Sequence, residues 1–215
     1  MPVVEHAVIA AAGLGSRLGL GRPKCLLELG GKTLLAHQLA LLAHVPDVRI
    51  VVGFEEHQVM EAASAIRSDL VFVRNPAYRQ TTTLTSYALG ARGLAENCLY
   101  MDADIYFEPD SFAAFLKSCE QNPMLIGVTE AKTADAVYVR MEQGLVQGFT
   151  REQPQAYEWA NLCWLPPEYC ASGQGAVFER LSADLPLPAC VIRSFEVDTP
   201  HDYANAQAHW RDIPG

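Results

Sequence analysis

The sequence predicts a doubly wound α/β fold with a mostly parallel sheet and a small β-rich lid. Two observations over the first hundred residues favour the parallel sheet: short apolar runs alternate with segments of helical period, and the resulting order is β-α-β-α-β-α-β. A third observation favours the lid, because closely spaced strand patterns joined by turn residues replace this alternation in the second half.

The first half of the chain supplies the expected parallel strands and the helices that cover them. Residues 6–12 form an apolar run that stops at Gly13, as expected of a buried strand. Further strands are expected at 49–53, 70–73 and 97–101. Helices are expected at 33–44, 55–67 and 82–94, where apolar residues recur on a helical period.

The second half begins with a helix at 110–121 and a strand at 124–129, after which the pattern changes. Segments 135–141 and 145–149 predict a hairpin joined through Glu142-Gln143-Gly144. The remaining expected elements are a strand at 156–165, a helix at 168–182, a strand at 190–197 and a helix from Thr199. We expect one domain over residues 1–215, with the lid at 130–165.

Composition and charge narrow the class of protein. Of the 215 residues, 50% are hydrophobic, which excludes a disordered or fibrous chain. The 25 acidic and 16 basic residues give a net charge of −9, which argues against nucleic acid as a partner. No apolar run reaches the roughly 20 residues of a membrane helix, and the N-terminus lacks the basic start of a signal peptide. With six scattered cysteines and no C-x-x-C pair, we expect a cytoplasmic protein without a membrane partner.

A glycine-rich loop with nearby basic residues follows the first expected strand. In the stretch Gly13-Leu14-Gly15-Ser16-Arg17, the glycines let backbone N–H groups approach phosphate oxygens. Arg17 and Lys24 would add fixed positive charge. Neither a dinucleotide fingerprint nor a P-loop fits, because Leu18 and Leu26 stand where those motifs need glycine. The alternative to a phosphate site is a tight turn with solvated charges.

Two aspartates, Asp102 and Asp104, follow the fourth expected strand. This places them at the carboxyl edge of a parallel sheet, where open α/β folds bind ligands. Residues two apart in an extended chain point to the same side, and two close carboxylates favour a cation such as Mg²⁺. The alternative is a turn that caps the next helix, for which Asp110 is better placed.

The combined motifs resemble one family. Ala11-Ala12-Gly13-x-Gly15-x-Arg17, Pro23-Lys24, Gly31-Lys32-x-Leu34-Leu35 and the later Glu196-Val197-Asp198-Thr199-Pro200 are similar to nucleotidyltransferases that activate sugar phosphates, isoprenoid precursors and choline phosphate. The resemblance implies a Rossmann-like fold of the nucleotide-diphospho-sugar transferase type. It also implies a nucleoside triphosphate bound by the loop residues Ala11, Ala12, Gly13, Leu14, Gly15 and Ser16.

The same resemblance implies roles for the charged residues. Arg17 and Lys24 would be catalytic and would neutralise the phosphates at the transition state. Asp104 and Asp198 would be ligands of Mg²⁺, and Asp102 would belong to the nucleotide site behind them. A helix N-cap role for Asp198 or for the following Thr199 is the competing interpretation.

The polar stretch 75–86 precedes an expected helix and is assigned to the nucleotide. Hydroxyl groups and free N–H groups at a helix start suit a base edge or a phosphate, and we assign Thr83 and Ser86 this role. Helix capping alone is the alternative.

Aromatic residues around the expected lid are assigned to the acceptor. Aromatic faces and a carboxylate suit an amine, and the residues assigned to this role are Tyr157, Trp159, Trp164 and Glu196. Trp159 and Trp164 are five apart and face opposite sides of a regular strand, so at most one lines the pocket without a bulge. The tryptophan of the family aligns with Trp164, which we expect at the pocket, while Trp159 is expected in the core. Aromatic packing without a ligand is the alternative for the whole group.

The sequence looks most like the bacterial choline-phosphate cytidylyltransferases. We therefore expect a Mg²⁺-dependent enzyme that transfers CMP from CTP to a small phosphorylated acceptor, such as phosphocholine or an aminoalkyl phosphonate, and releases pyrophosphate. One alternative is a sugar-1-phosphate enzyme that uses UTP or dTTP. The other is a non-catalytic nucleotide-binding sensor, which would not need Arg17, Lys24, Asp104 and Asp198 together. The sequence leaves the acceptor and the oligomeric state open, a homodimer included.

Overall fold

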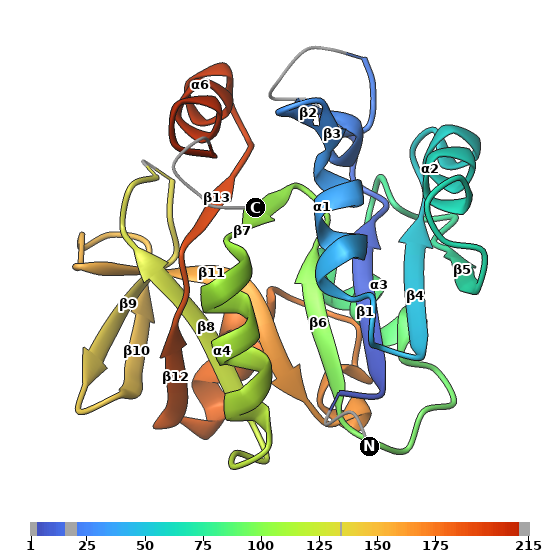
Figure 1. The fold of residues 1–215 in the computed structure, drawn as a ribbon. Coiled ribbons are helices and arrows are strands. Elements are labelled where there is room, and N and C mark those ends of the chain that lie inside the picture. The colour runs from blue at the N-terminus through green and yellow to red at the C-terminus, as the bar shows by residue number, and fades with distance from the viewer. Residues whose placement is uncertain (1–3, 16–20, 134, 211–215) are drawn as a thin grey trace.

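The computed structural model of the protein describes residues 4–15, 21–133 and 135–210. Within these residues, a nine-stranded sheet forms the centre of the molecule (Figure 1). Its strands are β1 (His6–Ala11), β4 (Asp47–Val52), β5 (Leu70–Arg74), β6 (Cys98–Asp102), β8 (Leu125–Glu130), β9 (Tyr138–Glu142), β10 (Leu145–Thr150), β11 (Tyr157–Leu165) and β12 (Leu187–Val191). They lie side by side in the order β5-β4-β1-β6-β11-β8-β12-β10-β9.

Helices cover both faces of this sheet. The helices are α1 (Leu34–Leu41), α2 (Glu56–Ser64), α3 (Thr83–Gly90), α4 (Pro109–Cys119), α5 (Val177–Leu181) and α6 (Pro200–His209). Side chains of α1, α2 and α4 belong to the core on one face, and those of α3 and α5 to the core on the other (Figure 1). This confirms the expected doubly wound arrangement. No helix in the described ranges is long and apolar enough to cross a membrane.

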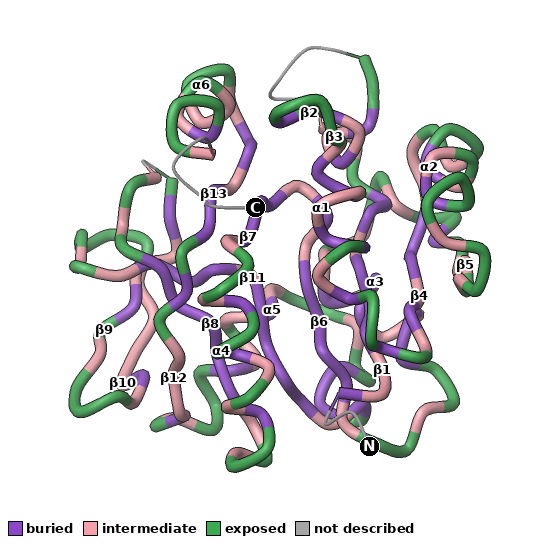
Figure 2. The backbone as a smooth tube through the Cα atoms, in the orientation of Figure 1, coloured by how far each residue is buried: buried purple, intermediate pink, exposed green. Residues whose placement is uncertain are grey.

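Strand β1 illustrates how one strand contributes to both cores. Val8 belongs to the core that contains α3, and its neighbour Ile9 belongs to the core that contains α1; both are fully buried. Successive side chains of a strand point to opposite faces, so a strand covered on both sides needs a continuous apolar run. Figure 2 shows the central strands buried along most of their length. The apolar run at 6–12 therefore predicted the strand correctly.

Four neighbouring parallel strands of the sheet end at one common edge, the carboxyl edge, where open α/β folds bind ligands. β5, β4, β1 and β6 pair in parallel, so their carboxyl ends meet at one edge of the sheet. The register pairs Ala10 of β1 with Asp102 of β6, and the backbone N–H of Ala103 donates to the carbonyl oxygen of Ala10 at 3.1 Å. The glycine loop after β1 and the aspartate turn after β6 therefore begin side by side.

Beyond β6 the sheet becomes mixed, and the strands expected in the lid take part in it. β11 pairs antiparallel with both β6 and β8, so it lies at the centre of the sheet. The hairpin of β9 and β10 continues the same sheet, because β10 pairs with β12 and β9 pairs with the start of β11. The strands between residues 130 and 165 thus belong to the central sheet through long-range pairing.

Two other expected elements differ from the structure. The helix expected at 168–182 is replaced by a 3-10 helix, Pro167–Cys170, and the short α5. Gly173 and Gly175 lie between them with φ values of 60° and 83°, a conformation that ends a right-handed helix. The strand expected at 190–197 is split, because β13 (Ser194–Glu196) leaves the sheet and pairs antiparallel with β7 (Ile105–Phe107).

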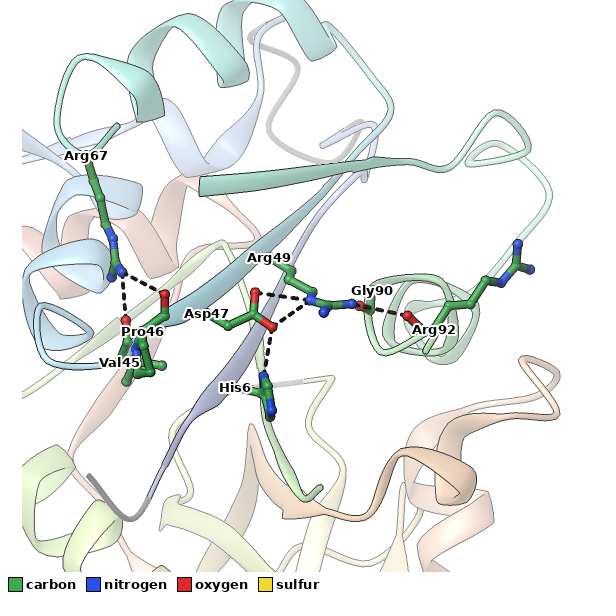
Figure 3. Close-up of polar contacts among 8 residues, drawn as sticks. All are labelled: His6, Val45, Pro46, Asp47, Arg49, Arg67, Gly90 and Arg92. Atoms are coloured by element: carbon green, nitrogen blue, oxygen red, sulfur yellow. Dashed lines mark hydrogen bonds and ion pairs between the residues drawn. The ribbon is translucent and has the colours of Figure 1, made fainter. Parts of the chain in front are cut away.

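A polar network joins elements at the amino-terminal edge of the sheet, opposite the glycine loop (Figure 3). The carboxylate of Asp47 in β4 accepts a hydrogen bond from Nε of Arg49 at 2.9 Å and contacts Nδ1 of His6 in β1 at 2.7 Å. Nη1 of Arg49 donates to the carbonyl oxygens of Gly90 and Arg92, at 3.1 and 3.2 Å. The network ties β1 and β4 to the end of α3.

A third, smaller core joins an early segment of the chain to α6. The early segment is a short hairpin, β2 (Glu28–Leu29) and β3 (Lys32–Thr33), with Gly30 and Gly31 in its turn. The apolar members of this core are Leu27, Leu29, Leu34, Tyr106, Phe195, Val197 and Ala206. The Tyr203 hydroxyl on α6 donates to the carbonyl oxygen of Glu28 at 2.8 Å. The ring of Trp210 covers Gly30 so closely that an ideal Cβ there would lie 1.8 Å from it.

Gly30→Ala is expected to destabilise the protein more than Gly31→Ala. Both glycines have positive φ values, 57° and 81°, so alanine at either position costs about 1 kcal/mol of backbone strain. At Gly30 the methyl group also meets the Trp210 ring, which adds about 1–3 kcal/mol, whereas nothing lies within 4 Å of a Cβ at Gly31. Urea unfolding of the two variants gives the comparison, and equal losses of stability would show that the ring does not constrain Gly30.

Candidate active site

Two adjoining cavities lie at the carboxyl edge of β1 and β6. The first is bounded by the glycine loop, the 75–86 segment and the aspartate turn. Its wall includes most of the residues expected to bind the nucleotide, namely Ala11, Ala12, Gly13, Gly15, Thr83, Ser86 and Asp102. Leu14 is not part of this wall. The expected residues Ser16 and Arg17 lie outside the described residues, so their roles stay predictions.

Asn75 organises the polar wall of the first cavity. Its amide group is buried and donates to the hydroxyl oxygens of Thr81, at 2.9 Å, and Ser86, at 3.4 Å. Its Oδ1 accepts from the backbone N–H of Ala77 at 3.1 Å. The side chain of Thr82, which precedes α3, does not cap the helix and donates instead to the carbonyl oxygen of Gly175 at 2.6 Å. Sequence reasoning did not single out Asn75, although the polar run at the end of β5 signalled this wall.

Lys24 lies at the centre of the charged part of the site. Its Nζ is 2.6 Å from Oδ2 of Asp104 and forms a second ion pair with Asp198. Lys24 begins a 3-10 helix, Lys24–Leu26, that follows the glycine loop. Gly15 has a φ of 61°, and a Cβ there would lie 2.9 Å from Cγ of Lys24. The glycine therefore allows the loop to approach the lysine side chain.

The two carboxylates that meet at Lys24 are brought together by a pair of short strands. Asp104 lies in the turn between β6 and β7, and Asp198 follows β13. The register of these strands pairs Ile105 with Glu196, and the backbone N–H of Val197 donates to the carbonyl oxygen of Asp104 at 3.0 Å. The expected metal ligands Asp104 and Asp198 are therefore close in space although they are 94 positions apart in the sequence.

Of the two residues that the sequence left open as the N-cap before α6, Asp198 and Thr199, the structure shows Thr199 in this role. The N-cap of α6 is Thr199, whose hydroxyl accepts from the backbone N–H of Asp202 at 3.2 Å. The sequence favoured Asp110 as the N-cap of α4, but the structure shows Glu108 in this role. The carboxylate of Glu108 accepts from the backbone N–H groups of Asp110 and Ser111 at 3.0 and 2.8 Å. Both helices are therefore capped by residues other than the site aspartates.

Burial and charge act in opposite directions on the protonation of this site. Burial disfavours the charged form of Lys24, but the carboxylates of Asp104 and Asp198 outweigh it and raise the pKa of Lys24. Burial, together with the negative charge of Asp104, raises the pKa of Asp102 to about 8. The hydroxyl of Tyr87 donates to Oδ1 of Asp102 at 2.7 Å and partly opposes that shift.

Glu196 joins the two expected metal ligands. Asp104, Glu196 and Asp198 each offer a carboxylate oxygen within 4.8 Å of the others. Nδ2 of Asn161 donates to Oε2 of Glu196 at 3.3 Å. Burial, followed by the negative charges of Asp104 and Asp198, raises the pKa of Glu196 well above its usual value. Glu196 precedes Asp198 by two residues on an extended segment, and this spacing could have indicated the shared side.

The second cavity adjoins the first at the same charged residues. Lys24, Asp102, Asp104 and Thr81–Thr83 contribute to both walls. The outer wall comes from β11, α5, the end of β13 and the segments that flank the β9–β10 hairpin, and includes Thr133, Asp135, Arg151, Glu158, Trp159, Asn161, Phe178, Glu196 and Asp198. Buried Glu158 accepts from the backbone N–H groups of Lys132 and Thr133 at 3.1 and 3.0 Å. It thereby fixes one edge of this wall.

The structure buries both tryptophans, in the cores on opposite faces of β11. Trp159 lies in a core, as expected, and also lines part of the second cavity, whereas Trp164 packs beside Leu99 and Leu125, its register partners in β6 and β8. The expectation that Trp164 faces the pocket is therefore wrong. The physical reason is that the second cavity adjoins the face of β11 on which Trp159 lies, and Trp164 is on the other face. Tyr157, also expected at the acceptor, pairs with β8 and β9 and lines neither cavity.

Asp102→Asn is expected to stabilise the metal-free protein at pH values near 8 and to have little effect near pH 4. A carboxyl group whose pKa is raised by folding holds its proton more tightly in the folded chain, so stability falls as pH rises from its ordinary value of 3.8 to about 8. Asparagine removes this loss and retains an acceptor for Tyr87. Urea unfolding in EDTA across this pH range measures the difference, and parallel curves for parent and variant would contradict the account.

Comparison with known proteins places this site in a family. A family model described as the MobA-like NTP transferase domain matches residues 7–186. The CMP-5'-(3-aminopropyl)phosphonate synthase of Streptomyces rubellomurinus is 32% identical over 175 residues, which cover 74% of this chain. The match spans only 28% of that longer relative. A 2-C-methyl-D-erythritol 4-phosphate cytidylyltransferase of Synechococcus is 26% identical over 219 residues. This match covers 94% of this chain and 96% of that relative.

Solved structures share the fold over nearly the whole chain. The inositol-1-phosphate CTP transferase of T. maritima superposes with a TM-score of 0.78 at 15% identity and covers 99% of both chains. The CTP:phosphocholine cytidylyltransferase of Streptococcus pneumoniae gives a TM-score of 0.76 at 19% identity, over 94% of this chain and 97% of that one. Together with the family match, these findings confirm the resemblance that the motifs indicated. The chain belongs to the MobA-like NTP transferase family, and its domain is that of a nucleotidyltransferase.

Proposed function

We propose that the protein is a Mg²⁺-dependent cytidylyltransferase that transfers CMP from CTP to a small phosphorylated acceptor and releases pyrophosphate. The observation that carries the proposal is the position of Lys24, Asp104 and Asp198 where the two cavities meet. One cavity would hold the nucleotide and the other the acceptor. The names of the relatives from Streptomyces and Synechococcus support cytidine as the base.

The donor set suits a hard divalent cation. Asp104, Glu196 and Asp198 offer carboxylate oxygens within 4.8 Å of one another, and Mg²⁺ binds oxygen ligands. We assign Asp104 and Asp198 as its ligands, with Glu196 beside them. When bound, the ion would neutralise negative charge on the phosphates of both substrates. Lys24, whose pKa these carboxylates raise, remains protonated and adds a second positive charge.

The proposed reaction needs little proton transfer. An oxygen of the acceptor phosphate attacks the α-phosphorus of CTP, and the bond from that phosphorus to the bridging oxygen of the β-phosphate breaks. Since the attacking oxygen is already anionic, catalysis rests on positioning and on neutralising charge. Lys24 would stabilise the charge that develops at the α-phosphate. Backbone N–H groups near Gly13 and Gly15, with Arg17 as predicted from the sequence, would hold the leaving pyrophosphate.

The second cavity favours an acceptor that carries an amine. Its described wall includes the acidic residues Asp135 and Glu196 and the basic residue Arg151, and the ring of Trp159 lines part of it. An aromatic face near carboxylates suits a cationic group. The Streptomyces relative is named for an aminopropyl phosphonate, which has this combination of an amine and a phosphorus oxyanion.

Pyrophosphate release with a panel of nucleotides and acceptors tests the activity. CTP with an aminoalkyl phosphonate or phosphocholine is expected to give turnover, and Asp104→Asn is expected to lower kcat by about 100-fold or more because it weakens metal binding. Asp110→Asn, which removes the same charge from the exposed first turn of α4, serves as the control. Preference for UTP or dTTP with a sugar 1-phosphate would favour the alternative enzyme, and nucleotide binding without turnover would favour a sensor.

Trp159→Ala is expected to weaken binding of a cationic acceptor while leaving CTP nearly unaffected. A desolvated cation–π contact contributes about 2 kcal/mol, so KM for an amine-bearing acceptor should rise by about 30-fold. KM for an uncharged acceptor of similar size should rise much less. Steady-state kinetics with both acceptors make the comparison. If the two KM values rise together, the ring is structural packing and the acceptor is not recognised as a cation.

A further inference from the structure

Gln38 is a fully buried polar residue of α1 that contacts the aspartate turn and no substrate cavity. Its Nε2 donates to two backbone carbonyl oxygens, those of Asp102 and Ile105, each at 2.8 Å. These two carbonyl groups stand at the two ends of the turn that carries Asp104. One side-chain amide therefore brackets the whole turn.

The same amide group leaves a buried acceptor without a partner. Oε1 of Gln38 is buried and forms no hydrogen bond within the described part of the chain. An unsatisfied buried polar atom typically costs about 1–3 kcal/mol of stability. The other buried residues of α1, Leu34, Leu35 and Leu39, are apolar. The stability of α1 packing therefore does not explain a glutamine at this position, whereas its two donated hydrogen bonds do.

The aspartate turn is held from three directions. The backbone N–H of Ala103 donates to Ala10 of β1 at 3.1 Å, and the carbonyl oxygen of Asp104 accepts from Val197 at 3.0 Å. Gln38 supplies the third restraint, from the helix behind the turn. The first two restraints are made by backbone groups that every sequence has. Gln38 restrains the backbone of the turn through a side chain, so its effect can be tested by substitution.

We propose that Gln38 is a positioning residue that holds the carboxylate of Asp104 in its metal-binding orientation. The inference rests on the proposed function, in which Asp104 is a metal ligand. Its physical basis is that a ligand on a loose turn samples many orientations, whereas a clamped turn presents it in one. Residues that orient a metal ligand typically affect metal affinity or activity by about 10–100-fold when they are replaced.

Gln38→Met tests the proposal, because methionine has a similar length and no donor. With CTP present and no acceptor, Mn²⁺ binding measured by electron paramagnetic resonance should weaken by about 10-fold, and kcat should fall by a similar factor. KM for CTP should change by less than about twofold, since Gln38 lines neither cavity. Amide hydrogen exchange in the peptide that contains 102–105 should become faster, which is a readout independent of activity.

Leu39→Ala is the matched control on the same helix. It removes buried apolar volume and should lower stability by about 2–5 kcal/mol, a general effect of core truncation that leaves the Gln38 amide group in place. Its Mn²⁺ affinity should stay close to that of the parent when both are measured well below their unfolding temperatures. If Gln38→Met does not fold, Gln38→Asn provides the comparison: the amide donor is retained on a side chain one methylene shorter, so an intermediate loss is expected.

Two results would overturn the inference. Parent-like Mn²⁺ binding and kcat in a folded Gln38→Met variant would show that the turn holds its shape without the clamp. An equal loss in Leu39→Ala would show a general effect of stability. Asp104→Asn, measured in parallel, separates the two proposals. If it binds Mn²⁺ as the parent does, the proposed metal site is wrong; if it loses Mn²⁺ while Gln38→Met does not, only the role of Gln38 is wrong.

Discussion

The ion pairs of Lys24 with Asp104 and Asp198 are the interaction on which the rest of the site depends. Several carboxylates meet at one partly buried point, and like charges so close need a compensating cation. In the structure as described, that cation is Lys24. The proposed nucleotide and acceptor cavities join at this point, so the charge that organises the site lies where the proposed transfer of CMP would take place.

The fold brings these three residues together from distant parts of the chain. Parallel pairing of β1 with β6 sets the glycine loop beside the aspartate turn, and pairing of β7 with β13 brings Asp198 to the same turn. The third core then ties the segment after Lys24 to α6, which follows Asp198, and the Trp210 ring covers Gly30 at this junction. Packing far from the cavities thus fixes the relative positions of the charged groups within them.

The sequence predicted the parts of the site that depend on local pattern. The apolar run before Gly13 and the paired aspartates after the fourth strand were enough to place both at one sheet edge, because parallel strands share that edge. Features set by long-range pairing were not predictable. Trp159, not Trp164, lines the second cavity because that cavity adjoins one face of β11, and no periodicity in the sequence indicates which face it is. In the sequence, Gln38 is one polar residue in a largely apolar helix, and its contact with the aspartate turn could not be predicted because the two segments are distant along the chain.

Without substrates, Lys24 pairs with the two aspartates that we assign to Mg²⁺. A crystal structure with CTP and Mg²⁺ bound tests this assignment most directly. The account predicts an ion bound to Asp104 and Asp198, with Nζ of Lys24 moved from those carboxylates to the α-phosphate of CTP. Lys24 still paired with both aspartates, with CTP bound and no ion between them, would contradict it.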